Sequence, residues 1–274
     1  MSHNLSKAAR PANQTSVFVK RKRMYTFFFL GVIAIMIASS LIANFDYIVG
    51  IKSIPKAITW SLTKFIPNSS SWHWLTDEIL KALFETALMS VAVTACSAVF
   101  AFAFSLLGTR TTKINPLIGR AVRIIASFFR NIPDVAWVLV LFMAFGQNIL
   151  TGFFALFFVT FGLLTRTFIE TIDEISASCV EALHASGANY MQVVFRGIIP
   201  SSAAALISWV LYMIETNIRN ATLIGIISGT GIGFWFNWFL KSLNYGAAGL
   251  TLITIVVLVI AIEITSTQIR RAIL

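Results

Sequence analysis

The sequence predicts an all-α integral membrane protein, and composition, apolar runs and the placement of charge each support this class. Hydrophobic residues make up 57% of the chain and charged residues only 12%, whereas about a quarter of the residues in a soluble domain are charged. The apolar runs are continuous rather than alternating, which excludes a membrane β-barrel. The net charge of +10 lies beside the apolar runs, so it indicates membrane topology rather than a nucleic-acid partner.

Six apolar runs are expected to cross the membrane as helices. A hydrocarbon core of about 30 Å takes about 20 residues at a rise of about 1.5 Å per residue. The third run is short and opens with Pro133, so its helix is expected to begin earlier, within 124–129. The expected spans are Met24–Asn44, Leu80–Leu107, Ile132–Phe145, Ile149–Phe168, Ala203–Gly225 and Gly249–Thr267.

The stretches around these spans predict the domain organisation. Apolar residues recur at helical spacing in the outer loop, which predicts a helix lying in the outer interface. Basic and apolar residues between Leu117 and Arg130 predict an inner interfacial helix that turns into the third span at Pro133. The expected parts are a disordered basic tail over 1–23, a first span over 24–45, an outer loop over 46–79 and a five-span block over 80–270.

The basic residues also predict the orientation. One cluster precedes the first span, a second separates the second and third spans, and Arg270 and Arg271 close the chain. With six spans, all three sites fall on one side, which the positive-inside rule assigns to the cytoplasm. Both termini and the segment 171–200 are therefore expected inside the cell, although three lysines in the outer loop run against the trend.

The segment between the fourth and fifth spans carries the clearest functional pattern, Glu181-Ala-Leu-His-Ala-Ser-Gly-Ala-Asn, which continues to Ile199-Pro200. Glu181, Ala182 and Ala185 favour a helix, Gly187 interrupts it and Pro200 ends the segment, so a helix, a turn and a second helix are expected. One interpretation is an amphipathic interfacial helix without a partner. The pattern closely resembles the coupling loop of bacterial ABC importer permeases, which docks into a cleft of the ATPase subunit.

Charged and polar residues interrupt the fifth apolar run. Glu215 and Arg219 are four residues apart on one helical face and can pair, while Asn217 adds hydrogen-bonding capacity. Such residues lock helices together or line a transport pathway, and both roles remain open. The glycines that follow do not form a nucleotide-binding loop, because no strand precedes them. We expect a tight turn or close helix approach there, before an interfacial or re-entrant helix; they are Gly225, Gly229, Gly231 and Gly233.

The stretch from Glu215 to Gly233 resembles the phosphonate-importer permeases of the PhnE family, as does Arg130-Asn-Ile-Pro-Asp134. Ser228 and Thr230 depart mildly from that pattern. The resemblance implies a type I, MetI-like ABC importer core that works with a second permease copy, identical or paralogous. It also implies a dimer of ATPase subunits that bind ATP and Mg, and a periplasmic or lipid-anchored solute-binding protein. Arg219 and Arg130 become candidates for guiding the anion, since guanidinium matches phosphoryl oxygens.

Other functional classes receive less support. The two cysteines and three histidines are scattered along the chain, so no metal or cofactor site is expected. No Walker loop or catalytic cluster is present, so the chain is expected to be a transport subunit rather than an enzyme. The alternatives are an ABC permease for another small solute, or a channel or secondary transporter that works alone and would not need the coupling loop.

Overall fold

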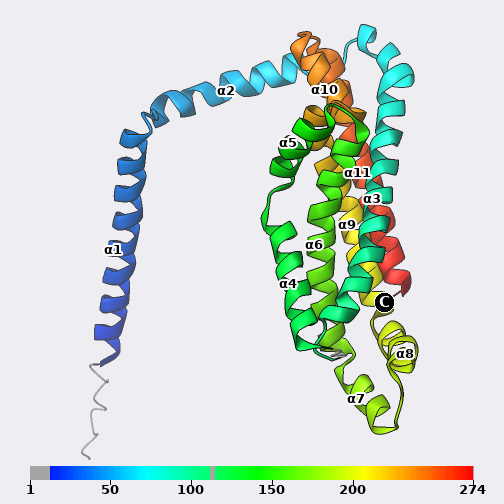
Figure 1. The fold of residues 1–274 in the computed structure, drawn as a ribbon. Helices are drawn as coiled ribbons and strands as arrows, with labels where there is room; N and C mark the ends of the chain where they lie inside the picture. Colours follow the sequence, from blue (N-terminus) through cyan, green and yellow to red (C-terminus); the bar gives the residue numbers. More distant parts are fainter. Residues whose placement is uncertain (1–12, 112–114, 274) are drawn as a thin grey trace, which may run out of the picture. The chain divides into compact units, whose positions relative to one another are not determined.

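The computed structural model describes residues 13–111 and 115–273, and every regular element in them is helical (Figure 1). The chain forms two compact units, Met1–Leu62 and Thr63–Leu274. The functional segments predicted from the sequence all belong to the second unit.

The first unit contains α1 (Asn13–Ile42) and most of α2 (Tyr47–Lys64). The prediction of a disordered tail over 1–23 is wrong from Asn13 onward, because no helix breaker separates this residue from the apolar run and the helix extends through the basic cluster. Residues 1–12 lie outside the described part. The helix expected in the outer loop is present as α2.

Four long helices form the frame of the second unit: α3 (Leu80–Gly108), α6 (Ile149–Ile175), α9 (Ile199–Ser228) and α11 (Tyr245–Ile273). A π-helical turn, Leu75–Ile79, leads into α3. Among the described residues five helices are long and apolar enough to cross a membrane, or six if one bent pair forms a single span. The expectation of six spans agrees with the larger count.

The bent pair consists of α4 (Pro116–Asn131) and α5 (Asp134–Phe145), which meet at an angle of 88°. The break falls at Ile132 and Pro133, as expected for a proline that cannot continue a helix. The expectation that the helix of the third span begins within 124–129 is wrong, because these residues belong to α4 and α5 begins at Asp134. The helix α4 is amphipathic, and its buried Val122 and Ala126 lie on the side that packs against α6 and α3. The close packing depends on Gly162 of α6, where a Cβ atom would lie 2.7 Å from the carbonyl oxygen of Ala126.

A helical hairpin closes the C-terminal end of α9. The helix continues to Ser228, three residues past the expected end of the span, and then turns through Gly229 and Gly231, whose φ angles are +71° and +62°. The returning helix α10 (Gly231–Lys241) packs against α9 and α11. With 11 residues it is too short to cross a membrane, in agreement with the expectation of an interfacial or re-entrant helix.

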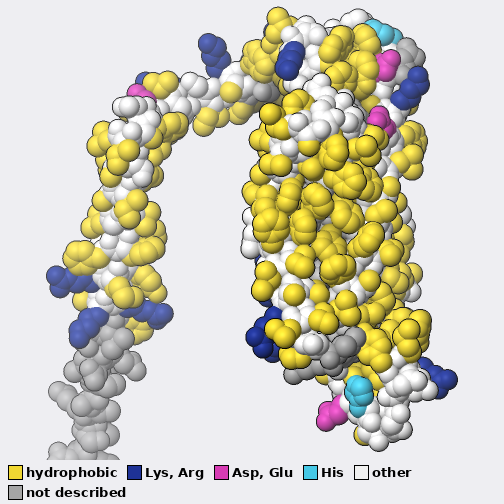
Figure 2. Space-filling model, viewed as in Figure 1, with side chains coloured by type: hydrophobic (Ala, Val, Ile, Leu, Met, Phe, Trp, Pro, Cys, Tyr) yellow, Lys and Arg dark blue, Asp and Glu magenta, His cyan; other side chains and the backbone are white. Residues whose placement is uncertain are grey.

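The interior of the second unit is mainly apolar, with buried Ser and Thr hydroxyls among the apolar side chains. Several of these hydroxyls bond to the carbonyl one turn earlier, as Thr86, Ser90 and Thr94 do in α3. Figure 2 shows hydrophobic side chains across the middle of the visible face of this unit, and Lys and Arg side chains toward its two ends. This distribution fits a bundle surrounded by acyl chains.

Candidate functional site

The segment after α6 is a compact helical structure rather than a loose connection. It consists of α7 (Ala177–Ala185), α8 (Tyr190–Val193) and a π-helical turn, Val194–Ile198, that leads into α9. Its side chains form a small apolar core of their own against the end of α6, and we call the residues 177–198 the coupling segment. The buried members of this core are Ile172, Val180, Val193, Val194 and Ile198.

The turn between α7 and α8 is closed by hydrogen bonds at both helix ends. The amide of Gly187 donates to the carbonyl of His184, and that of Ala188 donates to the carbonyl of Leu183, both at 3.0 Å. This arrangement is a Schellman motif, which needs a left-handed residue at the position of Gly187, where φ is +81°. Asn189 then caps α8 in a capping box with Gln192.

The outward surface of the coupling segment is accessible. Glu181, Ala182 and Ala185 are exposed, and a Cβ atom on Gly187 would meet no atom of this chain within 4 Å. Two large apolar side chains on the same segment, Met191 and Phe195, are 62% and 63% exposed. Sequence reasoning missed them, although their four-residue spacing places both on one face of the second helix.

Pro200 lies where the segment passes into the next span, as expected, but it does not interrupt the helix. The helix is continuous from Tyr190 to Ser228, and Pro200 lies in the first turn of α9. Proline lacks the amide that an unbroken helix would use there, and the preceding π-helical turn is a common way to absorb such an interruption. The second half of the coupling segment and the span α9 therefore belong to one helix.

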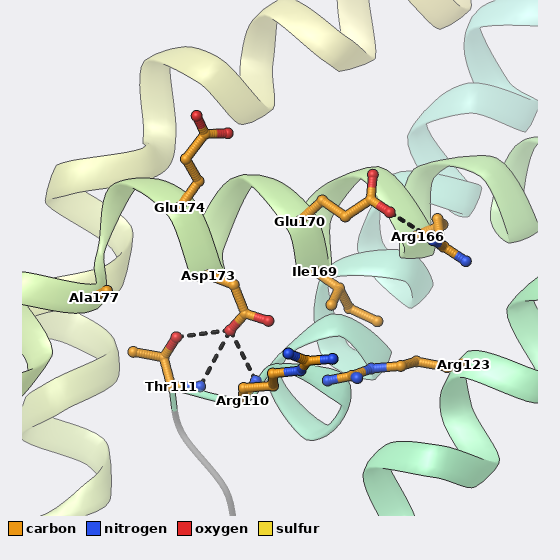
Figure 3. Close-up of a pocket in the computed structure, with 9 residues that line it drawn as sticks. All are labelled: Arg110, Thr111, Arg123, Arg166, Ile169, Glu170, Asp173, Glu174 and Ala177. Atoms are coloured by element: carbon orange, nitrogen blue, oxygen red, sulfur yellow. Dashed lines mark hydrogen bonds and ion pairs between the residues drawn. The ribbon is translucent and has the colours of Figure 1, made fainter.

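A polar cavity of 670 Å³ lies beside the start of the coupling segment (Figure 3). In it one oxygen of Asp173, near the end of α6, accepts hydrogen bonds from the amides of Arg110 and Thr111 and from the Thr111 hydroxyl, at 2.8, 3.1 and 2.7 Å. The guanidinium of Arg123 in α4 donates two bonds to the carbonyl of Gly108. The end of α3 is therefore held by both α4 and α6, a connection that sequence reasoning did not anticipate.

The charged residues of α9 form an ion pair that extends to α11. Glu215 lies 2.8 Å from Arg219 through one carboxylate oxygen and 3.7 Å from Arg270 through the other. The side chain of Glu215 is 12% exposed, whereas that of Arg219 is 45% exposed. Sequence reasoning had used Arg270 only as a marker of topology, and its contact with Glu215 is new.

Asn217 lies away from this pair. Its amide is 1% exposed and donates to the hydroxyls of Thr94 in α3 and Thr160 in α6, at 2.9 and 3.0 Å. This residue therefore joins three helices in the interior, and the interpretation of Asn217 as a pathway residue is not supported by its position.

The remaining predicted residues lie at two helix ends. Arg130 is exposed at the end of α4, and its guanidinium forms no hydrogen bond or ion pair within 13–111 and 115–273. Gly225 and Gly233 allow α9 and α10 to approach, because a Cβ atom on Gly233 would lie 2.0 Å from the carbonyl oxygen of Thr222. In the described part of the chain no three His, Cys, Asp or Glu side chains are placed to hold a metal ion.

Comparison with known proteins identifies the family. Residues 104–273 match the family described as binding-protein-dependent transport system inner membrane component. The phosphite transport system permease protein PtxC of Stutzerimonas stutzeri is 26% identical over 277 residues, 99% of each chain. The phosphate-import permease protein PhnE of Mycolicibacterium smegmatis is 28% identical over 190 residues, which are 69% of this chain and 36% of that longer protein.

Solved structures agree on the fold. A chain of the MetNI methionine ABC transporter superposes with a TM-score of 0.59 at 21% identity, covering 73% of this chain and 99% of that one. A chain of a bacterial alginate ABC transporter gives a TM-score of 0.56 at 13% identity, with coverage of 92% and 97%. The chain belongs to the binding-protein-dependent transport system inner membrane components, the membrane-spanning permease subunits of ABC importers.

Proposed function

We propose that this chain is the permease subunit of an ATP-driven importer of phosphonates or related phosphorus oxyanions. The substrate class is inferred mainly from Arg219, whose guanidinium is half-exposed in a membrane-spanning helix and is held by Glu215 at 2.8 Å. A guanidinium binds phosphoryl oxygens in a bidentate manner. The names of the relatives, which refer to phosphite, phosphate and phosphonate, support the same class of anion.

The proposed assembly contains a second permease, identical or paralogous, a dimer of ATPase subunits and a solute-binding protein outside the membrane. ATP and Mg belong to the ATPase subunits. The coupling segment, with Glu181, Ala182, Ala185 and Gly187 on its accessible surface, is the docking surface for the ATPase. Both chain termini and this segment lie in the cytoplasm of the bacterial cell, as the basic clusters favour.

Transport by the reconstituted complex tests the substrate class. With the partner ATPase and binding protein in liposomes, uptake of radiolabelled phosphite, phosphate or methylphosphonate should require ATP. Arg219→Gln should reduce uptake about tenfold or more, because a hydrogen bond between charged groups is lost, and Arg219→Lys should retain part of it. The control is Arg271→Gln, which changes an exposed arginine at the end of α11 and should transport normally.

Two outcomes would favour other functions. ATP-dependent uptake of a different solute, with none of these anions carried, would indicate a sister importer. Uptake without ATP would indicate a secondary transporter and would remove the role of the coupling segment.

Labelling tests the orientation independently. In intact cells a cysteine introduced at Ser186 should be shielded from a membrane-impermeant thiol reagent, and one introduced at Ser70 should react. Labelling of Ser186→Cys from outside would contradict the assignment of the coupling segment to the cytoplasm.

A further inference from the structure

Glu263 is a further carboxylate within a membrane-spanning helix, and the sequence patterns did not single it out. It lies in the C-terminal half of α11 and is exposed beside two exposed apolar residues, Ile260 and Ile264. Its carboxylate forms no hydrogen bond or ion pair with the described part of the chain. An ionised side chain in contact with acyl chains is strongly unfavourable, so this position calls for a polar neighbour from outside this chain.

The position of Glu263 relative to the ion pair of α9 follows from helix geometry. Glu263 and Arg270 are seven residues apart, about 10.5 Å along the same face of α11. Arg270 contacts Glu215, and α9 and α11 run in opposite directions (Figure 1). Arg219 lies one helical turn from Glu215, toward the outer end of α9. Because α11 runs in the opposite direction, Glu263 lies two turns from Arg270 toward that same end. Arg219 and Glu263 are therefore at neighbouring depths on adjacent helices.

Two acidic and two basic side chains thus lie on α9 and α11 within about two helical turns of depth. We call Glu215, Arg219, Glu263 and Arg270 the charged seam. The side chains of Glu215 and Arg270 are partly buried, with 12% and 30% of their surface exposed. The side chain of Arg219 is 45% exposed. A half-exposed guanidinium and an exposed carboxylate on neighbouring helices cannot both face hydrocarbon. The seam therefore faces water or polar protein.

We infer that Glu263 faces the same water-filled anion path as Arg219 and that α11 lines this path together with α9. The inference rests on the proposed function for the identity of the anion. A carboxylate that faces the same path as the arginine offsets part of the attraction of the path for a phosphorus oxyanion. The anion is consequently passed along the path rather than held at Arg219.

Thiol accessibility tests this placement in the complex with the ATPase and binding protein, after Cys96 and Cys179 are replaced by serine. Glu263→Cys should react with a small charged methanethiosulfonate reagent about tenfold or more faster than a thiol facing lipid, because only a hydrated thiol ionises readily. The matched control is Val257→Cys. Val257 is 61% exposed on the same helix, and its direction differs from that of Glu263 by about 120° around the helix axis. Trapping the ATPase with ATP and vanadate should change the rate at Glu263→Cys and leave the control unchanged.

Equal and slow rates at the two positions would overturn the inference. If Glu263→Cys does not assemble, Thr267→Cys, one turn away on the same face, carries the same expectation. Rapid labelling without transport of any phosphorus oxyanion would leave this inference standing and refute the proposed substrate. Normal transport of these anions with an unreactive Glu263→Cys would refute this inference alone.

Discussion

Substitutions at Gly187 can separate backbone strain from the presence of a partner. The residue has φ of +81°, and a side chain placed there would meet no atom of this chain. Within this chain, therefore, a substitution costs only the left-handed conformation. If the ATPase occupies the adjacent space, as the proposed docking requires, the size of the side chain should matter as well.

The strain follows from the backbone. Alanine in the left-handed region costs about 1 to 2 kcal/mol, and asparagine costs less because it visits this region readily. If strain alone decides, Gly187→Asn should transport better than Gly187→Ala. If a partner fills the space, the larger asparagine should transport worse. The buried core of the coupling segment, including Val180 and Ile198, should keep the segment folded in both variants.

The assay is ATP-dependent uptake in proteoliposomes, together with the amount of ATPase that copurifies with the permease. If Gly187→Asn transports better than Gly187→Ala and binds the ATPase normally, backbone strain alone explains both variants and the docking surface is refuted.

Three further substitutions test the charged and polar contacts. Glu215→Gln should lower the yield of folded permease in size-exclusion chromatography, and combining it with Arg219→Gln should restore only part of that yield, because Arg270 remains unpaired. Asn217→Leu should destabilise the bundle by about 1 to 3 kcal/mol, because two buried hydroxyls each lose a partner, and an unchanged melting temperature would contradict this. Asp173→Ala should raise the ATP hydrolysed per anion transported by loosening α3 from α6, whereas Asp173→Asn, which keeps an acceptor oxygen, should not.

Sequence patterns predicted those helices and turns whose formation depends on neighbouring residues. The helix, turn and helix around Gly187 and the break at Pro133 follow from residues adjacent in sequence. Contacts between distant residues were missed, because periodicity gives the face of a helix but not the helix that it meets. Asp173 and the amide of Arg110 are 63 positions apart. The burial of Asn217 was misjudged for the same reason, since its partners lie on α3 and α6.

The continuous helix from Tyr190 to Ser228 joins the second half of the coupling segment directly to the span α9. Its 39 residues extend about 58 Å at a rise of about 1.5 Å per residue, nearly twice the thickness of the hydrocarbon core. A tilt of about 5° about one end would displace the other end by about 5 Å over this length. A small rotation imposed at α8 would therefore reach Arg219 without an intervening joint other than the π-helical turn Val194–Ile198. The stiffness of that turn would then determine how much of a movement of the ATPase is transmitted along the helix to its membrane-spanning part.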